Sequence, residues 1–108
     1  MSFADNLQKL PSIDHLAELQ IFDAQGQFVD SIPNLPGKAG SVRLYAALAA
    51  KHGGLTVAAA QEGLELFAEH TQAARLHPGS HPNIDRLFGI IESGQAMSVK
   101  CIERTQDR

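Results

Sequence analysis

The stretch that decides the fold is residues 16–32, LAELQIFDAQGQFVDSI. From Leu16 to Phe22, apolar and polar residues alternate, which is typical of a strand with one face in a core. Residues 23–26 have an aspartate first and a glycine last, as in a tight turn. Residues 27–32 form a second run of strand-favouring residues. Two such runs around a glycine-containing turn predict an antiparallel hairpin.

Four other segments show apolar residues at helical spacing, and a fifth alternates. The predicted helices cover residues 2–10, 42–52, 58–76 and 83–93, and the alternating run predicts a strand over 96–103. Residues 55–57 fit either a short strand or a helix cap at Thr56. Ser2 and Asp5 have the spacing of a capping box, and Ser41 is the expected N-cap of the helix over 42–52.

Two residues in the predicted helices carry packing information. Gly63 lies inside a helix, where glycine costs about 1 kcal/mol relative to alanine. We therefore expect a close helix contact at that point. Phe88 lies on the most clearly amphipathic helical segment and is expected in the core.

The predicted elements define a fold class. Three short strands cannot cover a core by themselves, so the helices must pack against the sheet. The 108 residues correspond to one domain. We expect residues 1–108 to form a two-layer α+β domain, with a small antiparallel sheet (the hairpin plus the C-terminal strand) and helices packed on one face.

Composition excludes several classes of protein. The formal net charge is −3 and no basic stripe is present, which argues against nucleic-acid binding. No 18-residue apolar stretch or signal-peptide pattern occurs, so we expect a cytoplasmic protein that does not bind membranes. The single cysteine, Cys101, excludes an intramolecular disulfide. It shares the face of a predicted strand with Met97 and Val99 and is expected to be a buried, inert thiol.

The first candidate site is the stretch HPGSHPNID, residues 77–85. Pro78 and Gly79 permit a sharp chain reversal, so the imidazoles at either end of the turn could face a common space. The candidate ligand-binding residues are His77, Ser80, His81, Asn83 and Asp85. A metal ion bound by His77 and His81 would need further ligands, for which His70, Asp85 and Cys101 are candidates.

A purely structural interpretation also explains this stretch. Pro82 suits the first turn of a helix, with Ser80 or His81 at the cap. Asp85 in the first turn would complement the helix dipole. The stretch would then be a helix start and nothing more.

The second candidate site is Gly37-Lys38-Ala39-Gly40-Ser41. Glycines before a helix, with a lysine and a hydroxyl, can present backbone N–H groups to an anion, so Gly37, Lys38, Gly40 and Ser41 are candidate anion-binding residues. The order of residues is not that of a Walker A loop. A plain capped loop is the alternative.

The hairpin, residues 36–41 and residues 77–85 together resemble a small bacterial domain-of-unknown-function family, over nearly the whole chain. The resemblance implies a bacterial cytosolic protein and carries over no activity and no catalytic residue. The residues themselves favour a binding or interaction module that forms a homodimer and uses the 77–85 loop, with a protein or a small ligand as its other partner. The alternative is a small metal-binding protein or enzyme built on His77 and His81. We expect no organic cofactor.

Overall fold

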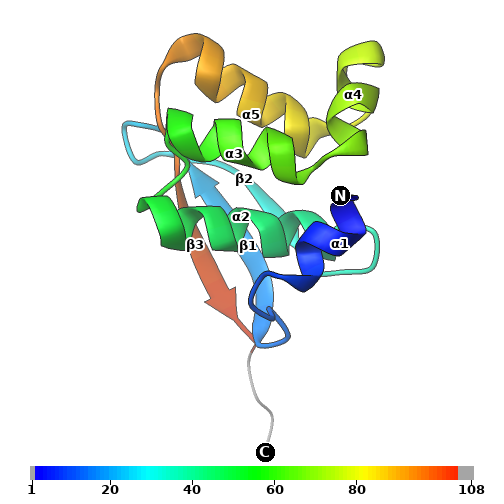
Figure 1. The fold of residues 1–108 in the computed structure, drawn as a ribbon. Coiled ribbons are helices and arrows are strands. Elements are labelled where there is room, and N and C mark those ends of the chain that lie inside the picture. The colour runs from blue at the N-terminus through cyan, green and yellow to red at the C-terminus, as the bar shows by residue number, and fades with distance from the viewer. Residues whose placement is uncertain (1, 105–108) are drawn as a thin grey trace, which may run out of the picture.

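The computed structural model describes residues 2–104. The elements are α1 (Phe3–Gln8), β1 (Leu16–Phe22), β2 (Phe28–Pro33), α2 (Ala39–His52), α3 (Val57–Leu66), α4 (Glu69–Leu76), α5 (Pro82–Ser93) and β3 (Ser98–Glu103). The strands form one antiparallel sheet in the order β2-β1-β3, with the helices on one side of it (Figure 1). The predicted α+β class and helix-covered sheet are confirmed. Among residues 2–104, no helix has the length and apolar composition needed to cross a membrane.

The predicted hairpin joins β1 to β2. Asp23 organises its turn, because the Asp23 carboxylate accepts the backbone N–H groups of Gln25 and Gln27, each at 2.9 Å. Gly26 has φ of 82°, a left-handed conformation that glycine adopts without a side-chain clash. Leu19 pairs with Ile32, which places both side chains on the helix-covered face.

The third strand is confirmed with a shorter range than expected. β3 pairs with β1 from Ser98 opposite Phe22 to Glu103 opposite Leu16. Met97 makes an isolated bridge with Leu55, so the segment after α2 touches the sheet. Thr56 then caps α3 by accepting the N–H of Ala59 at 3.0 Å.

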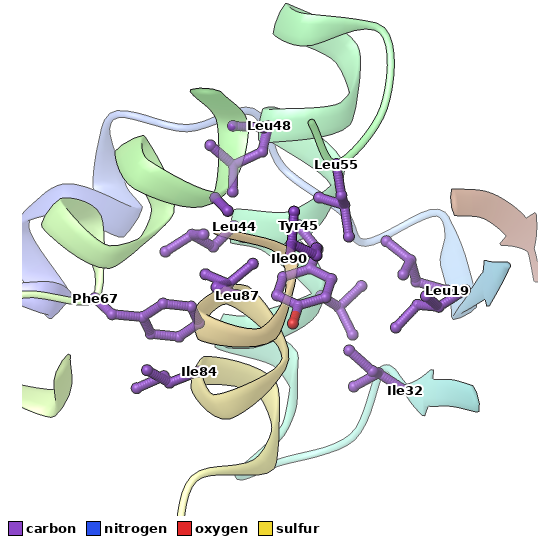
Figure 2. Packing of buried hydrophobic residues seen from close by; sticks show 14 of the residues in the cluster. Leu19, Ile32, Leu44, Tyr45, Leu48, Leu55, Phe67, Ile84, Leu87 and Ile90 are labelled. Atoms are coloured by element: carbon purple, nitrogen blue, oxygen red, sulfur yellow. The ribbon is translucent and has the colours of Figure 1, made fainter. Parts of the chain in front are cut away.

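The core lies between the sheet and the helices. α2 contacts all three strands, α3 packs on α2, and α5 packs on α3. Figure 2 shows Tyr45 in the middle of the buried cluster, with side chains of α5 on one side and Ile32 on the other. The largest fully buried side chains come from both layers and are Tyr45, Leu19, Ile21, Leu44, Leu48, Leu55, Ile84, Leu87, Ile90 and Val42.

Gly63 has the close contact expected of it. A Cβ atom at this position would lie 2.7 Å from Leu87 Cδ1 and 2.9 Å from Leu48 Cδ1. The absence of a side chain therefore lets α3 approach both α2 and α5. Phe88 is only partly buried, and the Arg75 guanidinium carbon lies 5.3 Å from its ring centroid. Its ring covers the edge of the core rather than filling it.

The single helix predicted over 58–76 is wrong. The chain breaks into α3 and α4 at Ala68, whose φ of 53° and ψ of −116° no helix allows. Alanine adopts positive φ only at a steric cost, so tertiary contacts must hold it there. One such contact is the Thr71 hydroxyl, which donates to the Leu64 carbonyl at 2.5 Å across the break.

The expectation of a buried thiol at position 101 is also wrong. Cys101 is exposed, because among residues 2–104 β3 has a neighbouring strand on one side only. The partial desolvation that remains raises the pKa of the Cys101 thiol. This thiol is consequently a poor nucleophile at neutral pH.

Candidate functional site: a cleft at the starts of α2 and α5

A cleft of about 630 Å³ lies where α2 and α5 begin. Its walls also include α1, β2, and the residues on either side of the α3–α4 break. In Figure 1, α2 and α5 both begin on the right-hand side of the view, close to α1 and α4. Residues from both stretches singled out in the sequence line this one cleft: Gly37, Lys38, Gly40 and Ser41 from the first, and Ser80, His81 and Asn83 from the second.

The start of α2 differs from the prediction. The helix begins at Ala39 with Lys38 at the N-cap, so Ser41 lies inside the first turn and is not the cap. No side chain of the described residues caps this helix. The backbone N–H groups of Gly40 and Ser41 have no hydrogen-bond partner within residues 2–104, as is usual in an uncapped first turn.

Gly40 lies in close contact with α1. A Cβ atom at this position would lie 3.0 Å from Phe3 Cζ and 3.2 Å from Leu7 Cδ1. α1 therefore rests on the first turn of α2 and forms one wall of the cleft. The Phe3 N–H donates to Glu69 Oε1 at 2.9 Å, a bond that lowers the pKa of the Glu69 carboxyl.

The 77–85 loop divides into two parts. Ser80, His81 and Asn83 line the cleft, whereas His77 and Asp85 do not. Asp85 Oδ2 accepts the Gly79 N–H at 2.9 Å, so this carboxylate closes the turn before α5. The Ser80 hydroxyl donates to the His77 carbonyl at 2.6 Å, and this bond also stabilises the turn before α5.

The imidazole nearest to His81 is that of His70, not His77. The ring centroids of His70 and His81 are 5.6 Å apart. Residue spacing could not indicate this pair, because the α3–α4 break at Ala68 sets the position of His70. Periodicity also gave no sign that Phe3 and Phe67 would line the same cleft.

A polar network holds the start of α5 in place. The buried Tyr45 hydroxyl donates to the Asn83 carbonyl. Arg86 donates to Asn83 Oδ1 at 2.8 Å and to Asp30 Oδ2 at 2.6 Å, which ties α5 to β2. Burial raises the pKa of Tyr45 to about 12, and the nearby Arg86 charge only partly opposes this effect.

Apart from the histidines, the charged side chains that line the cleft are Lys38 and Asp30. Asp30 is its acidic side chain, and Arg86 neutralises it. Lys38 has no ion pair within residues 2–104. The two helix N-termini add partial positive charge, since each carries the equivalent of roughly half a unit charge. The cleft can therefore hold an acidic group.

Lys38 is in an unfavourable position for the stability of α2. A cation at a helix N-terminus opposes the helix dipole, and lysine is a poor N-cap. Local stability thus gives no reason for a lysine at this point of the cleft.

The side chains considered as zinc ligands are not gathered together. Within residues 2–104, no three His, Cys, Asp or Glu side chains lie close enough to hold one metal ion. Cys101 and Asp85 lie outside the cleft lining, and only His70 joins His81 there.

Comparison with known protein families matches residues 3–101 to the family described as "Uncharacterized protein conserved in bacteria (DUF2322)". The same comparisons found no match among curated proteins or solved structures. The matched range includes every element that lines the cleft.

Proposed function

The chain belongs to this bacterial family, whose description names no activity, and we propose from the cleft that it is a small-ligand binding protein. The ligand carries an acidic group, a carboxylate or a phosphate. The protein acts in the cytoplasm, where an unpaired and exposed cysteine such as Cys101 stays reduced.

One observation carries the proposal: two helix N-termini share one cleft with Lys38, which has no ion pair among residues 2–104. The first turns of helices bind anions because their N–H groups lack acceptors and the helix dipole favours negative charge. The N–H groups of Gly40 and Ser41 are such donors. Lys38 supplies a full positive charge at the same helix end.

The rest of the cleft suits a small organic molecule. Its volume of about 630 Å³ lies within the range of ligand pockets, roughly 300–1,000 Å³. Apolar side chains from α1 and α5, such as Leu7 and Ile84, line it beside the polar groups. This mixture is typical of pockets in which a few polar groups orient a largely apolar ligand.

The proposal is tested by titrating inorganic phosphate into isotope-labelled protein and recording backbone amide shifts. We expect the largest shifts at Gly40 and Ser41. Replacing Lys38 by Ala should weaken binding by about tenfold, since a charge-assisted contact contributes roughly 1.5 kcal/mol. Lys51→Ala is the matched control, because Lys51 lies in the last turn of α2 and pairs with Glu62.

The control variant should bind phosphate as the unmodified protein does. An equal loss of phosphate affinity in Lys38→Ala and Lys51→Ala would indicate a general effect of net charge. Shifts that avoid the first turn of α2 would refute the proposed site.

We also propose that the chain self-associates through β3. Within the part of the chain that the structure describes, the sheet order β2-β1-β3 leaves the outer backbone edge of β3 without a neighbouring strand. An uncovered edge strand readily pairs with another strand. Light scattering from micromolar to millimolar protein should show a dimer at the upper end, and a monomer throughout would contradict the proposal.

A further inference from the structure

Four rings lie in consecutive contact along one wall of the cleft. Phe3 stacks on Phe67 with centroids 5.3 Å apart and an interplanar angle of 14°. The edge contact between Phe3 and His70 is 5.0 Å, and His70 is 5.6 Å from His81. The series joins α1, α4 and the residue before α5, so three separate parts of the chain bring these rings together.

The two ends of this series differ. Phe67 is 3% exposed and belongs to the core. His81 is partly exposed, precedes α5 and caps no backbone group. Within residues 2–104, neither His70 nor His81 has an ion pair. The series thus ends in the cleft with two imidazoles whose nitrogens have no ion-pair partner among these residues.

Such an end suits another flat ring. Aromatic rings prefer stacked or edge contacts at centroid separations of about 4.5–7 Å, the spacing seen along this wall. Imidazole nitrogens also offer hydrogen bonds to ring heteroatoms. An aliphatic chain could use the apolar surface but would gain neither contact.

We propose that the acidic ligand also carries a flat aromatic or heteroaromatic ring; this inference rests on the proposed function. The ring packs against His81 and His70, and the acidic group lies at Lys38 and the first turn of α2. The ligand class is therefore an aromatic acid.

The test compares phenylacetate with cyclohexylacetate, which share the acidic group and differ in the flatness of the ring. Acetate is the third probe. We expect phenylacetate to bind at least about threefold more tightly than cyclohexylacetate, in line with the gain from one aromatic pair. Phenylacetate should also shift the side-chain proton signals of His70 and His81 through its ring current, and cyclohexylacetate should not.

His81→Leu should remove the preference for phenylacetate while retaining acetate binding. His77→Leu is the matched control, since His77 is exposed and lies outside the cleft lining. This variant should keep the preference. The ring-current shifts in the unmodified protein need no variant and decide the question if His81→Leu does not fold.

The outcomes separate the two proposals. Equal affinity for phenylacetate and cyclohexylacetate, with no shifts at the imidazoles, overturns the aromatic class and leaves the acidic-ligand proposal standing. If none of the three acids nor phosphate binds at the first turn of α2, both the acidic-ligand proposal and the aromatic class are refuted.

Discussion

The helices α2 and α5 are closely packed in their central parts, whereas their N-terminal ends border an open cleft. In their middles, Leu48 of α2 and Leu87 of α5 lie against Gly63 of α3, where an added Cβ atom would be 2.9 Å and 2.7 Å from their Cδ1 atoms. At their beginnings, a cleft of about 630 Å³ separates them. The same pair of helices therefore flanks both the close contact at Gly63 of α3 and the open cleft.

This difference assigns separate roles to the two regions. The buried apolar side chains in the middle determine the free energy of unfolding. The polar groups at the beginnings contribute little packing and present charge and N–H groups to the cleft. Substitutions in the middle should change stability, and substitutions at the beginnings should change binding.

The largest effect is expected from Leu87→Ala. Leu87 is fully buried in the core. Its truncation leaves a cavity, which typically costs about 2–5 kcal/mol. Urea unfolding would measure the loss, and a change below about 1 kcal/mol would mean that the contact at Gly63 is not tight. Phosphate should still shift the amides of the first turn of α2 in the folded variant.

Tyr45 links the two regions, because its ring lies in the core and its hydroxyl reaches Asn83 at the cleft. Burial raises its pKa from 10.0 to about 12. Below pH 10 the tyrosine is protonated in both the folded and unfolded states, so it adds no pH dependence. Between about pH 10 and 12 the unfolded state loses the proton first, and stability should fall by roughly 1.4 kcal/mol per pH unit.

The sequence makes this prediction simple to measure. Tyr45 is the only tyrosine and the chain has no tryptophan, so tyrosinate absorbance reports this one side chain. The folded protein should titrate near pH 12 and the urea-unfolded chain near pH 10. Tyr45→Phe should lack this part of the alkaline loss of stability. A native titration at pH 10 would show that the hydroxyl is in contact with water.

A pair of glycine substitutions tests the tight contact itself. Gly63→Ala should destabilise the protein by about 1–3 kcal/mol through overpacking, although alanine is the better helix former. Gly89→Ala in α5 is the control, because a Cβ atom there meets nothing within 4 Å. It should stabilise by about 0.4–1 kcal/mol. If both substitutions changed the free energy of unfolding in the same direction, the packing explanation for Gly63 would be wrong.

The packed region was largely predictable from the sequence. The alternation in residues 16–22 specifies the buried face of β1, and the structure confirms it. In residues 83–93 the apolar spacing is right for Ile84 and Leu87, whereas Phe88 is only partly buried. Gly63 indicated a close contact without naming its partners. The break at Ala68 was not predictable, since alanine favours helix and only the surrounding packing accounts for its positive φ.

The open region was predictable only in parts. The stretches 37–41 and 77–85 were each recognisable from their glycines, prolines and polar residues. Their meeting in one cleft depends on how α2 and α5 pack, which periodicity does not encode. His70 faces His81 because the chain turns at Ala68. The sequence argument, based on the chain reversal at Pro78 and Gly79, considered His77 instead.

The smallest effect on stability, and the sharpest contrast between the regions, is expected from Lys38→Asp. This change replaces a cation at the N-cap of α2 with an anion, which the helix dipole favours by about 0.3–1 kcal/mol. The variant should therefore unfold at a slightly higher urea concentration than the unmodified protein. Its cleft would carry a negative charge in place of a positive one, so phosphate should no longer raise its stability. Phosphate at ten times its dissociation constant should stabilise the unmodified protein by about 1.4 kcal/mol.

A variant that is less stable and still responds to phosphate would show that Lys38 is a structural residue of the loop. A variant that is more stable and unresponsive would show that this lysine is retained at a cost to α2 for what it binds.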